Sequence, residues 1–174
     1  MYPYFLFIAL SILMPADKSN MIDWSGSRKL TWTDFEGTPD RSSDNAALTS
    51  SHINFQFGYG ANDFNYTIRC TFDKKRSWVR VRSPYILNHE QRHFDIAEIH
   101  ARKLKKALTE YRYNEKTVEE VVSGMHENIM KEHHAMQAKF DLETDHSRNR
   151  TEQIRWDRKI DSLLKVYAAF SKYR

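Results

Sequence analysis

The stretch LNHEQRHFD, residues 87–95, places the pattern His-Glu-x-x-His inside a segment whose apolar residues recur at helical spacing. On an α-helix, His89 and His93 lie one turn apart on the same face, so two imidazole nitrogens can converge on one metal ion. Glu90 lies between them in angle, which directs its carboxylate toward a metal-bound water rather than the metal. The stretch therefore predicts a zinc hydrolase site that still needs a third protein ligand.

The helix that carries this stretch has a clear start in the sequence. Ser83-Pro84 combines an N-cap residue with a proline at the first helical position, and the apolar spacing continues for more than seven turns. We expect a helix over residues 84–111. Its more exposed faces are expected to carry three charged residues, Glu98, Arg102 and Glu110.

Two strands with strict alternation precede this helix. Apolar residues occupy every second position from Ile53 to Tyr59 and from Phe64 to Phe72, and a polar turn joins the two runs. The resulting hairpin has one apolar face, which the helix can cover while presenting its histidines at the edge. Shorter strands are expected within residues 17–44 and over residues 77–82.

Two further helices are expected after the first, over residues 117–140 and 151–173, from apolar residues at helical spacing. The order predicts an α+β fold in which an N-terminal antiparallel sheet or hairpin is followed by three long helices, the active-site helix first. A chain of 174 residues with 40% hydrophobic and 13% aromatic content suits one globular domain.

The distribution of charge and the cysteine content argue against several classes of function and of metal site. The 27 basic residues are interspersed with 23 acidic ones, so the net charge of +4 forms no stripe of one sign, and nucleic-acid binding is not expected. The single cysteine, Cys70, excludes an internal disulfide framework and a Cys-Cys metal site. Histidines and carboxylates must therefore hold any zinc.

The N-terminus predicts export from the cytoplasm. Residues 5–14 form an apolar run that fits a signal peptide and falls short of a membrane span. No Lys or Arg precedes the run, and Met14-Pro15-Ala16 is a poor cleavage site, so an uncleaved anchor or a buried segment stays open as an alternative. We expect residues 1–16 to be a signal peptide or anchor, residues 17–174 to form one domain, and no other stable membrane insertion.

The third ligand must come from outside the first motif. His100 lies seven residues beyond His93, about 10 Å farther along the helix axis, and cannot reach the same ion. Ile96 and Ile99 occupy the places where an extended metalloprotease pattern has glycine and histidine. The chemistry leaves three downstream candidates, ranked as His146, then Glu143, then His134.

At these residues the sequence resembles a bacterial family of predicted secreted zinc-dependent proteases, catalogued mostly as a domain of unknown function. The matching motifs are LNHEQxHFDIAE at 87–98, ARKL at 101–104, DxETxH at 141–146 and QxxW at 153–156. A further similarity lies upstream, in WxDFxGxPD at 32–40.

This resemblance implies a secreted or periplasmic, zincin-like α+β domain that binds one Zn²⁺ ion. His89 and His93 would be ligands, Glu90 the general base and His146 the third ligand, with Glu143 as its alternative. The family often has glycine where this chain has Arg92 and Ser147. Arg92 stands beside His93 and so bears on access to the site.

The function expected from the sequence is hydrolysis of a peptide bond in a peptide or protein substrate by a metal-activated water, with Glu90 transferring the proton. A cell-wall peptide amidase would use the same residues. A different class is a non-catalytic exported module, in which a structural metal pins the first helix to the segment around His146. Three residues are candidates for stabilising the developing negative charge: Tyr111, Tyr113 and Arg92.

Overall fold

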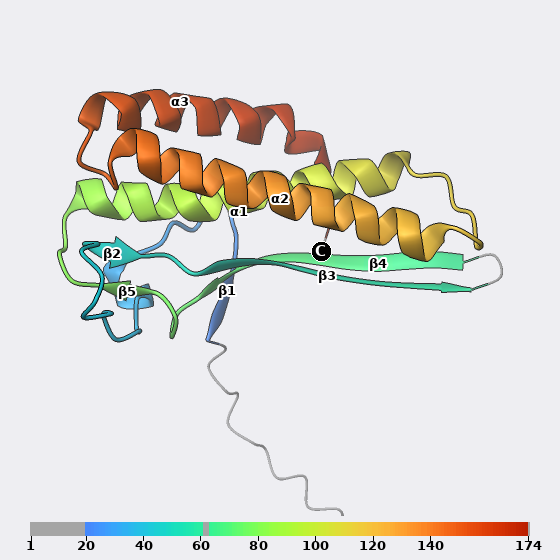
Figure 1. The fold of residues 1–174 in the computed structure, drawn as a ribbon, viewed down its shortest axis with the longest axis horizontal. Coiled ribbons are helices and arrows are strands. Elements are labelled where there is room, and N and C mark those ends of the chain that lie inside the picture. Colours follow the sequence, from blue (N-terminus) through green and yellow to red (C-terminus); the bar gives the residue numbers. More distant parts are fainter. Residues whose placement is uncertain (1–19, 61–62, 174) are drawn as a thin grey trace, which may run out of the picture.

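A long antiparallel hairpin and three helices make up the computed structural model, which describes residues 20–60 and 63–173 (Figure 1). The hairpin consists of β3 (Ser51–Gly60) and β4 (Asp63–Asp73). Both strands were predicted from the alternation of apolar residues, and the structure confirms them. Ile53 lies opposite Cys70, and both side chains are buried. The expected signal peptide or anchor, residues 1–16, lies outside the described residues.

A third strand, β1 (Met21–Asp23), pairs antiparallel with β4, so that the sheet order is β1-β4-β3. The short strand expected within residues 17–44 rested on Leu30, Trp32 and Phe35, but the strand in this range is β1, and residues Trp32–Asp34 form one turn of 3-10 helix instead. The Asp34 carboxylate accepts hydrogen bonds from the backbone N–H and hydroxyl of Thr31, which stabilises that turn.

A second, two-stranded sheet consists of β2 (Ala47–Leu48) and β5 (Trp78–Val79). The strand predicted over residues 77–82 is therefore shorter than expected, and its partner β2 was not predicted. Beyond β5, the N–H groups of residues 80–81 both donate to the carbonyl oxygen of Ala46, at 2.7 and 3.0 Å. Because both N–H groups share one carbonyl oxygen, the regular antiparallel pairing between β2 and β5 ends here.

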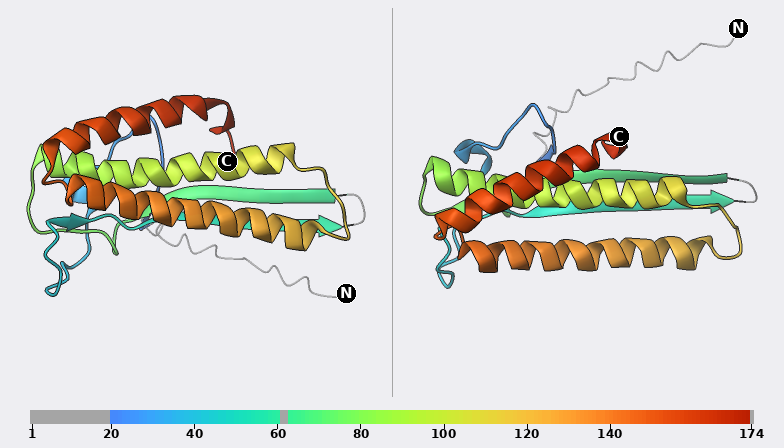
Figure 2. Two further views of the ribbon diagram at one scale, coloured as in Figure 1. Left: turned by 45° about the horizontal axis from the view of Figure 1, so that its top comes forward. Right: turned by 90° about the horizontal axis from the view of Figure 1, so that it is seen from above.

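The first helix, α1 (Pro84–Glu110), agrees with the predicted range to within one residue. Ser83 caps it, because its hydroxyl accepts a hydrogen bond from the Ile86 N–H at 3.0 Å. Figures 1 and 2 show α1 lying along the hairpin, with α2 (Val118–Thr144) beside it and α3 (Arg150–Val166) on the side away from the sheet. The fold is thus α+β, with the motif at the start of the central helix.

The ends of the other two helices differ from their predictions. α2 continues four residues past the expected end at Phe140, until Asp145 adopts a left-handed conformation with φ 47°. α3 stops at Val166, well before Tyr173, and a turn of 3-10 helix over Ala168–Phe170 follows it. The longer α2 matters for function, because its last turn carries residue Asp141 as part of a helix.

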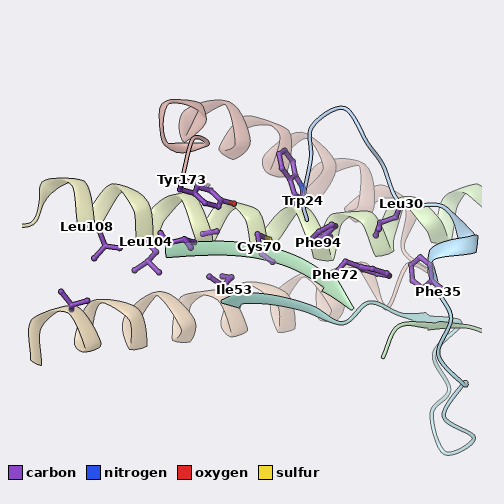
Figure 3. Close-up of a cluster of buried hydrophobic side chains, with 14 of the residues drawn as sticks. Trp24, Leu30, Phe35, Ile53, Cys70, Phe72, Phe94, Leu104, Leu108 and Tyr173 are labelled. Carbon is purple, nitrogen blue, oxygen red and sulfur yellow. The ribbon is translucent and has the colours of Figure 1, made fainter. Parts of the chain in front are cut away.

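Two hydrophobic clusters hold the layers together. The larger one joins the sheet to α1, α2 and the N-terminal segment (Figure 3). The smaller one joins the three helices and consists of Ile96, Ile99, Phe140, Trp156 and Ile160. Across the described part of the chain, no helix is long and apolar enough to cross a membrane.

The expected exposure of Glu98 and Arg102 is wrong. Both are buried, and they form an ion pair, with Arg102 Nε donating to Glu98 Oε1 at 2.8 Å. Tyr173 near the C-terminus also donates a hydrogen bond to Glu98. The segment after α3 folds back over this face of α1, which no helical periodicity in the sequence indicates.

Candidate metal centre

The His-Glu-x-x-His motif lies in the first turns of α1, and neighbouring segments fix it there. The side chains of His89 and Glu90 are only 3% and 4% exposed. The hydroxyl of Thr49 donates to the carbonyl oxygen of Glu90 at 3.2 Å, and the Leu30 N–H donates to Gln91 Oε1 at 2.8 Å. The motif therefore sits beneath the segment that leads from β2 into β3.

Three potential ligand atoms meet at this point. His89 Nε2 and His93 Nε2 lie 3.2 Å apart, and Asp141 Oδ1 on α2 lies 3.2 Å from the first and 3.0 Å from the second. Among the described residues, these three form the group that could hold a metal ion. In a tetrahedral zinc site with bonds of about 2.0–2.1 Å, ligand atoms lie roughly 3.3–3.4 Å apart. The observed spacing fits such a site closely.

The surroundings of each ring favour ligation through Nε2. His89 Nδ1 lies 2.9 Å from Gln153 Oε1, and His93 Nδ1 lies 2.6 Å from Gln137 Oε1. The ring of Phe140 stacks on His89 with centroids 4.5 Å apart. Each histidine is therefore held at its far nitrogen, and His89 also along its ring plane, so Nε2 of each ring faces the cluster.

The charges in the cluster are strongly coupled. Burial lowers the pKa of His93, but the hydrogen bond and charge of Asp141 outweigh burial and raise that pKa to about 9. Burial raises the pKa of Asp141, yet its hydrogen bonds with His89 and His93 outweigh burial and hold that pKa well below its usual range. The hydrogen bonds and charges of the cluster therefore favour a positive charge between these atoms.

The carboxylate of Glu90 lies beside the cluster. Its Oε2 atom is buried and has no partner among the described residues, although an unsatisfied buried polar atom costs about 1–3 kcal/mol. Glu90 lines a cavity of about 350 Å³ together with both histidines and Asp141. The other wall of this cavity is the backbone segment 45–51.

The three third-ligand candidates occupy different places. His146 lines the same cavity, and its Nδ1 lies 3.7 Å from Asp141 Oδ1, but its side chain is 46% exposed. His134 lies exposed at the cavity rim. Glu143 instead accepts a hydrogen bond from Trp156 Nε1 at 2.7 Å, so its carboxylate joins α2 to α3.

Residues 16–147 match the family described as bacterial proteins of unknown function, DUF922. The chain belongs to this family. The DUF922 match spans all three clustered residues and ends before α3 begins. No curated protein and no solved structure matches the chain.

Asp141 is the residue of this DUF922 chain that the sequence did not single out as a ligand. A helix predicted to end at Phe140 left Asp141 in a loop of unknown direction. Had the helix been extended by one turn, Gln137 and Asp141 would have fallen on one face, one turn apart. The helical spacing of Gln137 and Asp141 could therefore have indicated Asp141, but only if the end of α2 had been predicted correctly.

This DUF922 chain has Arg92 and Ser147 at two positions where the family that it resembles often has glycine. The structure shows what surrounds each of them. Arg92 points away from the cavity and binds three carboxylates, those of Asp95, Asp157 and Asp161. It therefore leaves access to the site unchanged. Ser147 has φ 75°, in the left-handed region that favours glycine.

The two tyrosines proposed to stabilise developing charge lie elsewhere. Tyr111 and Tyr113 pack against Phe64 near the far end of the hairpin, and the Tyr113 hydroxyl donates to the Gly60 carbonyl. Neither lines the cavity. His134 and His146 are exposed polar residues that do line it.

Proposed function

We propose that this chain is a zinc-dependent peptidase with a zincin-like active site. His89, His93 and Asp141 would hold one Zn²⁺ ion, because their ligand atoms already converge at the spacing that tetrahedral coordination needs. Both histidines offer nitrogen and Asp141 offers a carboxylate oxygen, a donor set that suits zinc.

The observation that carries a catalytic assignment is the Glu90 carboxylate. It is buried, has no hydrogen-bond partner at Oε2 in the described chain, and lines the cavity beside the ligand group. A carboxylate in that setting is available to accept a proton. A purely structural metal site has no use for it, which favours the enzyme over the non-catalytic module.

The reaction divides between the ion and the chain. Zinc at such ligands supplies Lewis acidity, which lowers the pKa of a water molecule and polarises a carbonyl group. Glu90 accepts the proton of the attacking water and passes it to the leaving nitrogen. The cavity, with segment 45–51 as its far wall, positions the scissile bond. A cell-wall peptide amidase would use the same groups on a different amide.

The substitution Glu90→Gln tests this proposal, because it keeps the side-chain shape and removes the base. We expect the variant to keep the Zn²⁺ content of the wild type and to lose at least about 100-fold in the cleavage of a mixed library of quenched fluorogenic peptides. Metal analysis and initial rates, measured on the same preparations, give both quantities.

Glu143→Gln is the matched control. It changes a carboxylate in the downstream motif that binds Trp156 and does not line the cavity. This variant should cleave the peptides at close to the wild-type rate. Full peptide cleavage by Glu90→Gln, or a wild-type protein that binds no zinc, would refute the assignment.

A further inference from the structure

The side chain of Gln153 on α3 bridges a ligand histidine and a carboxylate. It is 1% exposed, its Oε1 lies 2.9 Å from His89 Nδ1, and its Nε2 lies 2.9 Å from Asp157 Oδ1. Asp157 also accepts hydrogen bonds from Asn88 and Arg92 of α1, at 3.0 Å each. The amide is thus held at both ends in the interface between α1 and α3.

The direction of this bridge follows from hydrogen-bond chemistry alone. An ionised Asp157 can only accept, so the end of the Gln153 amide that faces it must be the NH₂ group. The other end is then the carbonyl oxygen, which also can only accept. His89 must therefore carry its proton on Nδ1, and a neutral His89 has its lone pair on Nε2, facing His93 and Asp141.

The opposite tautomer would close the cluster to a metal. With its proton on Nε2, His89 could donate to Asp141 Oδ1 at 3.2 Å, so one hydrogen bond would occupy two ligands at once. Gln153 removes this competitor by offering Nδ1–H its own acceptor. The Gln153 amide therefore favours the Nδ1–H tautomer of His89, which leaves the cluster open to a metal, over the Nε2–H tautomer, which closes it.

Gln137 on α2 repeats the arrangement at the second histidine. Its Nε2 donates to the His93 carbonyl oxygen at 2.9 Å, which fixes its Oε1 toward His93 Nδ1. The same Nε2 lies 3.0 Å from His133 Nε2. Burial lowers the pKa of His133 to about 3, so His133 is neutral and can accept there.

We infer that Gln153 and Gln137 are positioning residues that accept a hydrogen bond from the Nδ1–H groups of His89 and His93 and so turn Nε2 of each ring toward the cluster, and that docking of α3 through Gln153 is needed to make His89 ready for metal. This inference rests on the proposed metal site but not on the proposed peptidase activity. Gln153 lies on α3, after the matched residues 16–147, so the support for His89 comes from outside the matched region.

Three variants test the inference. Gln153→Met keeps the length of the side chain and removes both hydrogen bonds. Gln153→Glu keeps the acceptor for His89 but sets a second carboxylate against Asp157. Gln56→Met makes the same glutamine-to-methionine substitution at an exposed position on β3 and serves as the control. Each protein is assayed for Zn²⁺ affinity by chelator competition, for unfolding in urea without metal, and for the protonated nitrogen of His89 by long-range ¹H–¹⁵N NMR.

We expect Gln153→Met to weaken Zn²⁺ binding by about 10–100-fold and to move the His89 proton toward Nε2 in the metal-free protein. Gln153→Glu should keep Nδ1–H and an affinity at least as high as the wild type, although its metal-free form unfolds at lower urea because two carboxylates meet. The control should match the wild type in all three measurements.

The inference is overturned if Gln153→Met binds zinc as the wild type does, or if its His89 proton stays on Nδ1. It is also overturned if Gln153→Glu loses both Zn²⁺ affinity and stability in urea, because the affinity would then simply follow the stability of the fold. A wild-type protein that binds no Zn²⁺ would refute the proposed metal site, whereas the His89 proton position in metal-free protein would still decide the role of Gln153.

Discussion

Asp141 lies within 3.2 Å of both motif histidines, whereas His146 lies one contact farther out, 3.7 Å from Asp141. This difference favours Asp141 over His146 as the residue that would share an ion with His89 and His93. A carboxylate ligand also balances part of the charge of the ion, which a third histidine would not.

We therefore expect Asp141→Asn to weaken Zn²⁺ binding by more than about 100-fold, beyond the loss expected for an outer hydrogen-bond partner. His146→Ala should change the affinity by less than about tenfold, since its half-exposed side chain lies outside the ligand group. Metal content after dialysis and competitive titration measure both. Zinc lost from His146→Ala but kept by Asp141→Asn would restore His146 as the third ligand.

Ser147 illustrates backbone strain at a single residue. Residues 145, 146 and 147 all have positive φ, of 47°, 48° and 75°. Left-handed backbone costs a residue with a Cβ atom about 1–2 kcal/mol, and glycine avoids this at an entropic cost of about 0.4–1 kcal/mol. The chain therefore carries strain next to the cavity.

We expect Ser147→Gly to raise the free energy of unfolding by about 0.5–1 kcal/mol, the strain removed less the entropy lost. Urea unfolding measures this. The same substitution at Ser162, an exposed position inside α3, should lower stability, because glycine is a poor helix former. Equal effects at the two positions would show that residue 147 is not strained.

At the scale of elements, the N-terminal segment is fixed by close backbone contact with the turn after β4. The N–H groups of Glu36 and Gly37 donate to the carbonyl oxygens of Lys74 and Ser77, each at 2.8 Å. A Cβ atom at Gly37 would lie 2.7 Å from the carbonyl oxygens of both Lys75 and Ser77. The approach of these two segments requires glycine.

Gly37→Ala should accordingly lower the free energy of unfolding by about 1–3 kcal/mol, because backbone atoms cannot move aside as a flexible side chain can. Gly124→Ala is the control: it lies inside α2 with open space around it, and should stabilise the helix by about 1 kcal/mol. Thermal or urea unfolding distinguishes the two signs. A neutral Gly37→Ala would mean that the segment does not pack this closely in solution.

At the scale of the whole molecule, the candidate site joins elements far apart in the sequence. Two candidate ligands come from α1 and one from α2, and α3 supports the first histidine through Gln153. A metal bound there would link α1 to α2 in the folded state alone, so binding should stabilise the entire domain.

Zinc at about 100 times its dissociation constant should stabilise the protein by about 2.7 kcal/mol, which raises the Tm by about 5–10 °C for a chain of this size. Chelator should reverse the shift in differential scanning calorimetry. The double variant His89→Ala, His93→Ala should show no such shift. An equal shift in that variant would place the bound metal elsewhere on the protein.

The sequence by itself determined the hairpin, the three helices and the start of α1. Alternation from Ile53 to Phe72 and the Ser83-Pro84 cap are local signals, and the helical spacing of His89 and His93 follows from α-helix geometry without any tertiary contact. The same local rules excluded His100 from sharing an ion with that pair.

Only the tertiary structure decided the rest of the site. Asp141 and Gln153 reach the histidines because α2 continues past Phe140 and α3 docks on α1, and both depend on packing between segments about 50–65 residues apart. The burial of Glu98 with Arg102 has the same origin, since the returning C-terminal segment covers them. Periodicity fixes which face of a helix a residue occupies, but packing decides what that face meets.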